Sequence, residues 1–141
     1  MKYRVAAVGR MKDAALRAAC DGYLERLSHY AKVDETEVKD EARLLGVIPA
    51  GTRLVALSRT GDPWSSRDLA NHTERWEREA RDVVFAIGGA TALPDEVMKR
   101  ADDVWSLSAL TLPHELARVV VLEQLYRAYT IRRGEPYHRG P

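Results

Sequence analysis

The sequence lacks several features that mark particular classes of protein. It has one cysteine, Cys20, which excludes an internal disulfide framework and a cysteine-rich zinc site, and which we expect to be a small buried side chain. No apolar run approaches the ~20 residues of a membrane span, and the apolar stretch near the N-terminus is too short for a signal peptide. Neither a G-x-G-x-x-G fingerprint nor a Walker A loop is present. These absences predict a cytoplasmic globular protein with no membrane segment and no metal.

Length and charge narrow the class further. A chain of 141 residues, 45% of them hydrophobic, can bury roughly two-thirds of its unfolded surface, so we expect one domain over residues 1–141. The formal net charge is only +1. Arginines nevertheless gather near the C-terminus, where they either hold phosphates or form a solvated helix face. The four candidates are Arg118, Arg127, Arg132 and Arg133.

Apolar runs alternate with helical patterns along the chain. Strands are expected at five runs: residues 3–8, 33–38, 54–57, 83–87 and 104–107. Helices are expected after Asp13 to about residue 30, over residues 65–80 and 94–101, and from Pro113 to about residue 131. A loop is expected at residues 59–63, and one or two helical turns at 40–45. This order predicts an α/β sandwich with a mostly parallel sheet.

Two strand ends carry residues suited to a ligand, which in such sheets lies beyond the carboxyl ends of the strands. Gly88 and Gly89 follow the strand at 83–87, where glycine allows a ligand close to the backbone but also suits a plain tight turn. Residues 107–112 are free of charge and join a strand to a helix. Their main chain and apolar walls could hold an adenine, and a buried crossover would look the same.

The C-terminal tail brings together three side chains of complementary chemistry. Tyr137, His138 and Arg139 supply an aromatic ring, an imidazole and a guanidinium, a set that suits an extruded base, although chain ends often fray. His114 follows Pro113 beside the charge-free loop, where it either packs or takes part in a site. Two further histidines lie on helix patterns, where a packed or solvated ring is expected: His29 and His72.

Three blocks of the sequence resemble one family. They are Ile87-Gly88-Gly89, the run WSLSALTLPH from residue 105 to 114, and Tyr137-His138-Arg139. The resemblance is to the ribosomal RNA large subunit methyltransferase H family, of the SPOUT superfamily of S-adenosylmethionine-dependent RNA methyltransferases. It covers essentially the whole chain, and the block from residue 105 to 139 is long enough to be highly specific. The sequence departs from the family pattern at Ala92, where a third glycine is usual.

The resemblance implies a fold, an activity and a set of partners. The fold is an α/β sandwich with a C-terminal trefoil knot, which periodicity alone would never suggest. The activity is methylation of N3 of pseudouridine 1915 in helix 69 of 23S rRNA within the ribosome, by a homodimer that shares each site between two chains. By motif, the S-adenosylmethionine contacts fall on Leu57, Gly88, Leu107, Ser108, Ala109, Leu110, Thr111 and Leu112.

The chemistry of the acceptor assigns the tail a role. N3 of pseudouridine carries a proton that leaves only well above neutral pH, so transfer needs a base nearby or a cation that stabilises the developing negative charge. We therefore expect the tail, His138, Arg139 and Tyr137, to engage the target base as the catalytic residues.

Two other functions stay open at this point. A non-catalytic ribosome- or RNA-binding module of the same fold has Ala92 as its only support. A SPOUT methyltransferase acting on a different RNA base is the second alternative. Binding of S-adenosylmethionine tests the first, and mass spectrometry of the modified RNA tests the second.

Overall fold

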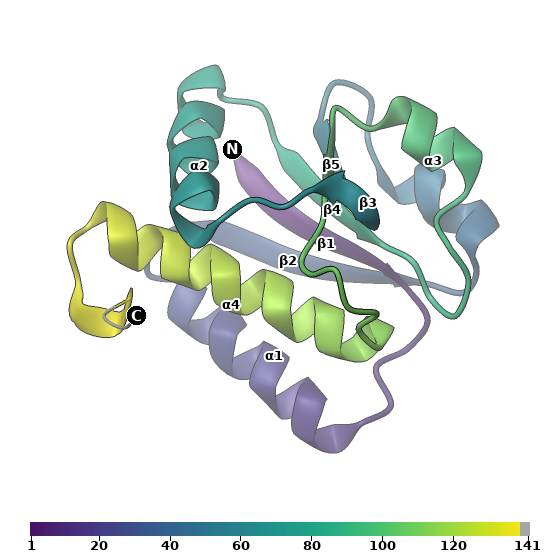
Figure 1. Cartoon of the computed structure of the whole chain (residues 1–141), viewed down its shortest axis with the longest axis horizontal. Helices are drawn as coiled ribbons and strands as arrows, with labels where there is room; N and C mark the ends of the chain where they lie inside the picture. The colour runs from purple at the N-terminus through teal and green to yellow at the C-terminus, as the bar shows by residue number, and fades with distance from the viewer. Residues whose placement is uncertain (139–141) are drawn as a thin grey trace.

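A computed structural model describes residues 1–138, in which five parallel strands form one twisted sheet (Figure 1). The strands are β1 (Lys2–Val8), β2 (Lys32–Val38), β3 (Arg53–Asp62), β4 (Val83–Ile87) and β5 (Asp103–Trp105). They lie in the order β2-β1-β4-β3-β5, and every neighbouring pair is parallel. The mostly parallel sheet predicted from the sequence is confirmed.

Helices cover both faces of the sheet. On one face lie α1 (Ala14–Leu27), α2 (Ser66–Glu79) and α4 (His114–Arg132), with α4 packed between the other two (Figure 1). The other face is covered by η1 (Glu41–Val47) and α3 (Asp95–Arg100), and η2 (Pro136–His138) ends the described chain. The predicted cap of α1 is confirmed, because the Asp13 carboxylate accepts the Leu16 amide at 3.0 Å. No helix in the described residues has the length and apolarity to cross a membrane.

Side-chain alternation along the strands builds a core on each face. Every residue of β4 is buried, as expected for the strand between β1 and β3. Phe85 points into the layer of α1, α2 and α4, whereas Val84 points toward η1 and α3. Trp76 and Cys20 are fully buried in the first layer, so the prediction that Cys20 is a small buried side chain is confirmed.

Two predicted boundaries are wrong at the edge of the sheet. Residues 59–63 were expected to form a loop, but β3 continues to Asp62, whose carbonyl accepts the Ser106 amide at 2.9 Å. Both Leu57 and Asp62 pair with Trp105, so the residues between them form a bulge. The last strand ends at Trp105 and not at residue 107. Contacts distant in sequence set both limits, and the trefoil knot stays a prediction.

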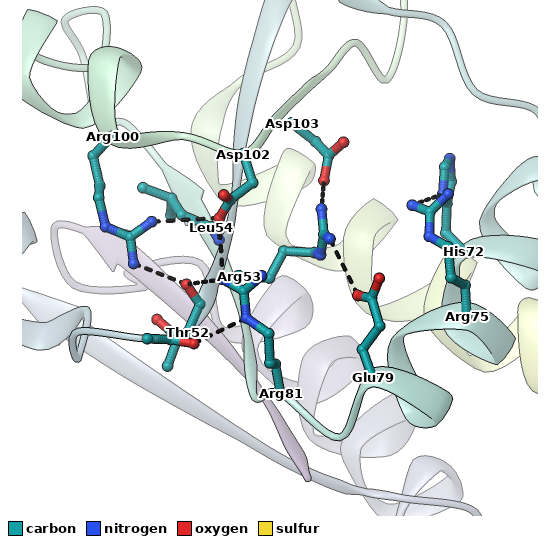
Figure 2. A network of polar contacts seen from close by, with 11 residues as sticks. Thr52, Arg53, Leu54, His72, Arg75, Glu79, Arg81, Arg100, Asp102 and Asp103 are labelled. Carbon is teal, nitrogen blue, oxygen red and sulfur yellow. Dashed lines mark hydrogen bonds and ion pairs between the residues drawn. The ribbon is translucent and has the colours of Figure 1, made fainter.

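The amino ends of the strands are fastened by a network of polar contacts (Figure 2). Arg53, at the start of β3, reaches the carboxylates of Asp103 at 2.9 Å and Glu79 at 3.1 Å. The Thr52 carbonyl accepts a hydrogen bond from Arg100 at 2.8 Å. At this edge the Arg53 and Arg100 side chains already bind groups of the protein itself. We therefore expect a ligand site at the opposite, carboxyl edge of the sheet.

Candidate functional site

A cleft opens at the carboxyl edge of the sheet. It encloses about 620 Å³ of empty space, part of it open to solvent. Its walls come from four segments: residues 57–59 of β3, residues 87–93 at and after the end of β4, Trp105 with the loop that follows it, and the start of α4. The site therefore lies where parallel α/β sheets bind their ligands.

The cleft brings together most of the residues that the sequence singled out for a cofactor. Six of the eight predicted contacts line it: Leu57, Gly88, Leu107, Ser108, Leu110 and Leu112. Ala109 and Thr111 belong to the same loop, but they are not part of the wall. The structure thus brings most of the predicted cofactor residues to one cleft. That they bind a cofactor stays a prediction.

The loop after β5 is shaped by its own serines. The buried Ser106 donates its hydroxyl to the Ser108 carbonyl at 3.1 Å, and the Ser108 hydroxyl accepts the Leu110 amide at 2.9 Å. Within residues 1–138, the main-chain groups of Leu107 and Leu112 form no hydrogen bond with the protein. They are available to a ligand that lies between the apolar side chains of the wall.

The glycine turn after β4 is closed by contacts within the chain. A Cβ atom on Gly88 would lie 2.9 Å from the Thr91 carbonyl oxygen, so the turn needs glycine there before any ligand is considered. The Thr91 hydroxyl donates to the Glu41 carboxylate at 2.8 Å, and this bond, together with backbone amides that include Gly89, lowers the pKa of Glu41. Nothing in the sequence connected Glu41, on η1, with the turn.

Charge is scarce in the cleft. Among the described residues of the wall, only Arg59 and His114 have basic side chains. His114, which the sequence left open between packing and a site, lies at the site. Arg59 was missed, and its only sequence signal is its place just after the apolar run at 54–57.

The arginines of α4 are largely engaged by carboxylates. Arg118 is 1% exposed and binds Glu35 at 2.9 Å and Glu37 at 2.8 Å on β2, so the suggestion that it holds phosphate is wrong. The ion pairs between α4 and β2 occupy the guanidinium, and the sequence alone does not show them. The other three also have neighbours in the fold: Arg127 with Glu123, Arg132 with Glu77, and Arg133 over the Tyr30 ring.

The start of the tail is held against α4 of its own chain. The Tyr137 hydroxyl donates to Glu123 at 2.7 Å, and its ring contacts Tyr126 edge-on at a centroid distance of 4.7 Å. Burial, with hydrogen bonds to Tyr23 and Glu123, raises the pKa of this phenol.

Tyr137 does not line the cleft of its own chain. Its partner Glu123 is nine residues beyond His114, which is about 13 Å along the helix axis. The other two predicted catalytic groups, the His138 side chain and Arg139, lie outside the described residues.

Comparison with known proteins agrees with this architecture. The model of a family described as predicted SPOUT methyltransferase matches residues 1–138. The chain is 49% identical to ribosomal RNA large subunit methyltransferase H of Sorangium cellulosum, over 97% of this chain and 99% of that one. It is 40% identical to the protein of the same name from Anaeromyxobacter sp., over 99% of this chain and all of the other.

Solved structures share the fold at low sequence identity. A probable methylase family protein from Haemophilus influenzae superposes with a TM-score of 0.64 at 9% identity, over 98% of this chain and 70% of the other. A probable methyltransferase from Bordetella pertussis gives 0.58 at 14% identity, over 90% and 95% of the two chains.

Proposed function

We propose, from the premise that this chain belongs to the ribosomal RNA large subunit methyltransferase H family of SPOUT methyltransferases, that it methylates 23S rRNA with S-adenosylmethionine as donor. The proposed acceptor is N3 of pseudouridine 1915 in helix 69, on ribosomes in the cytoplasm. One observation carries the proposal: the cleft at the carboxyl edge gathers Leu57, Gly88 and the loop after β5 around one space.

The wall of the cleft suits the adenosyl group. Leu57, Leu107 and Leu112 offer apolar surface to a flat ring, and the free main-chain groups of the loop can pair with its polar edge. S-adenosylmethionine, when bound, supplies a methyl group on a positively charged sulfur. The protein has to align that methyl with the acceptor nitrogen and to exclude water, which a largely apolar wall does.

The N3 proton of the acceptor base has to be removed for methyl transfer. An imidazole can take the N3 proton, and a guanidinium can stabilise the negative charge that spreads onto the neighbouring carbonyls. His114 and Arg59 place one group of each kind in the wall, and the proposed tail residues His138 and Arg139 supply a second set. We assign the contact with the base to the tail, with Tyr137 as a stacking ring.

The position of Tyr137 supports a site shared between two chains. Since Tyr137 is held against Glu123, six residues or about 9 Å along α4 beyond the last wall residue Ala117, a tail that reaches a cleft is best supplied by a second copy. A two-fold dimer gives each cleft the tail of its partner. We therefore propose a homodimer as the active unit, with a mass about twice 15.9 kDa in sedimentation.

Methyl transfer to ribosomes tests the proposed function. Purified protein, S-adenosylmethionine with a labelled methyl group and large ribosomal subunits that lack this modification should yield one methylated pseudouridine in 23S rRNA by nucleoside mass spectrometry. Cofactor binding without transfer to 23S rRNA would favour another RNA base as substrate. Absence of cofactor binding would favour a non-catalytic module.

A pair of leucine variants locates the cofactor. Leu107→Ala should weaken S-adenosylmethionine binding in calorimetry by roughly tenfold, as expected when about 1.4 kcal/mol of apolar contact is lost. Leu45→Ala, a half-buried leucine on the opposite face of the sheet, should leave the affinity unchanged. Equal effects of both changes would show that the cleft does not hold the adenosyl group.

Mixed dimers test the shared site. A chain truncated after Gly134 and a chain carrying Leu107→Glu should each be inactive, the first without a tail and the second with a charge in the cofactor wall. Mixing them forms dimers in which one cleft and one tail are intact, and activity should return. Heterodimers that form but stay inactive would overturn the exchange of tails.

A further inference from the structure

The linker between β1 and α1, residues 9–13, is fixed along its main chain. The Gly9 amide donates to the Val38 carbonyl at 2.8 Å, and the Met11 amide donates to the Glu37 carboxylate at 2.9 Å. The next two amides, at residues 12 and 13, both donate to one oxygen of Glu115 at 2.9 and 3.0 Å. Four of the five amides of the linker are held by tertiary hydrogen bonds, and its backbone is thereby preorganised.

The carboxylates that hold the linker stay ionised. The Asp13 amide, and to a smaller degree the Lys12 amide, lower the pKa of Glu115. Burial alone would raise the pKa of Glu37, but the Met11 amide and Arg118 outweigh it, so this pKa is lowered as well. Both contacts therefore persist at neutral pH.

Two cationic side chains project from this fixed backbone. Arg10 and Lys12 are exposed, and neither side chain forms a hydrogen bond or an ion pair anywhere in the part of the chain that the structure describes. The arginines of α4 differ, since Arg118, Arg127 and Arg132 are paired with carboxylates. Because the backbone is already ordered, contact with an anion would cost these two residues only side-chain entropy.

The linker borders the cleft. Val8, which precedes it, lies against the glycine turn, since a Cβ on Gly89 would be 3.2 Å from Val8 Cγ1. At its other end the linker is bound to Glu115, the neighbour of the wall residue His114. Arg59 lies in the wall on the β3 side, exposed and equally without a charged partner among residues 1–138. Cations therefore stand at two separate parts of the mouth.

We propose that Arg10, Lys12 and Arg59 form a phosphate-binding rim, which holds the backbone of the substrate RNA around the nucleotide that enters the cleft. The inference rests on the proposed function, and it names the residues that bring RNA to the site. Phosphate contacts of this kind fix the register of a nucleic acid without reading its sequence. Unpaired Lys and Arg side chains on an ordered backbone have the chemistry that such contacts require.

The salt dependence of RNA binding tests the rim. Binding of the dimer to large ribosomal subunits is measured over a series of KCl concentrations for wild type, the double variant Arg10→Ala/Lys12→Ala, and Arg59→Ala. The double variant should bind roughly tenfold more weakly near 0.1 M salt, and its slope of log affinity against log salt should be shallower by about 1.5, the share of two phosphate contacts. Arg59→Ala should make the slope shallower by about half as much.

The matched control removes the same charge elsewhere. Lys32 and Lys99 are exposed, lie at the start of β2 and in the last turn of α3, and have no ion-pair partner in the described residues. The double variant Lys32→Ala/Lys99→Ala should keep the wild-type slope. An equal loss in this control would show that only net charge matters, and would overturn the rim.

Two further readouts separate the remaining outcomes. The double variant Arg10→Ala/Lys12→Ala, whose residues lie outside the cofactor wall, should keep the wild-type affinity for S-adenosylmethionine and the wild-type thermal midpoint. Loss of cofactor affinity with unchanged RNA binding would place these cations on the cofactor and overturn the proposal, as would wild-type RNA affinity and slope. Weaker RNA binding by the rim variants, in a protein that transfers no methyl group to 23S rRNA, would support the rim while refuting the proposed function.

Discussion

Arg118→Met should lower the free energy of unfolding by about 3–5 kcal/mol, the usual loss when one partner of a buried ion pair is removed. The guanidinium is 1% exposed and lies 2.9 Å from Glu35 and 2.8 Å from Glu37, and the Glu35 side chain is 10% exposed. Methionine fills much of the same space but leaves Glu37 without its paired cation and Glu35 with Arg17 alone. The Arg118 Nε has no hydrogen-bond partner in the described residues, so methionine also removes one buried unsatisfied donor, and this gain offsets only part of the loss.

Urea unfolding measures this loss against a surface control. Arg43 is 65% exposed and pairs with Asp40 at 3.6 Å, so Arg43→Met should cost at most ~1 kcal/mol. Adding Glu37→Gln to Arg118→Met should recover part of the stability, because a neutral amide needs no counter-charge. Comparison with Glu37→Gln alone completes the cycle and measures the coupling between the arginine and Glu37.

The pH dependence of stability should differ between the wild type and Arg118→Met. In the wild type the pKa of Glu37 is lowered in the folded state, so its contribution is present above the unfolded value of 4.5 and is lost as the pH falls through the folded pKa. In Arg118→Met the Glu37 carboxylate loses its paired cation, so the pKa of Glu37 rises, and the variant should gain stability relative to wild type as the pH falls from 7 toward 5. A variant with wild-type unfolding at every pH but weaker RNA binding would refute the buried pairing and make Arg118 a phosphate ligand.

Three further changes probe the glycine turn, the core and a helix cap. Gly88→Ala should destabilise the fold by about 1–3 kcal/mol, because the new Cβ lies 2.9 Å from the Thr91 carbonyl oxygen. The control Gly22→Ala, on an open helix surface, should stabilise the fold by about 0.5–1 kcal/mol. Equal urea midpoints for the two variants would contradict the close approach at Gly88. Cys20 is fully buried and its pKa is raised to about 11, chiefly by burial, so a thiol reagent at pH 8 should label it only as fast as the protein unfolds, and rapid labelling would place it at the surface. Ser65→Ala removes the capping box of α2 and should cost about 1 kcal/mol, seen as a fall of roughly 3 °C in the thermal midpoint; an unchanged midpoint would show that the cap does not stabilise the helix.

Local pattern was enough to predict the elements of this fold. The run at residues 83–87 is apolar throughout, which is typical of a strand buried on both faces, and β4 occupies those residues. Asp13 and Ser65 marked the starts of α1 and α2 because a helix start needs a side-chain acceptor for its free amides. The extension of β3 to Asp62 escaped prediction because its partner, Ser106, is 44 residues away in the sequence.

The site was predictable only where a run of residues carries its own signal. The loop at 107–112 stands out as a charge-free stretch between two elements, and most of it lines the cleft. Arg59 and Glu41 gave no such signal, because each is a single charged residue on a surface segment. The prediction that Arg118 holds phosphate was wrong, because nothing in the neighbouring sequence shows that Glu35 and Glu37 lie next to it in the fold.

The order of the strands determines when this protein can fold. The middle strand, β4, is the fourth to be synthesised, so β1 lacks its second neighbour until residues 83–87 are made, and β3 lacks its second neighbour until β5 follows. The face that α1 and α2 cover in part is completed only when α4 packs between them, and the buried hydroxyls of Tyr3 and Tyr129, 126 residues apart, meet at 2.9 Å only then. Contacts of such long range form slowly and late. A nascent chain whose α4 has not yet emerged from the ribosome therefore has no closed core, and the cleft, which the start of α4 helps to line, forms only after that helix is available.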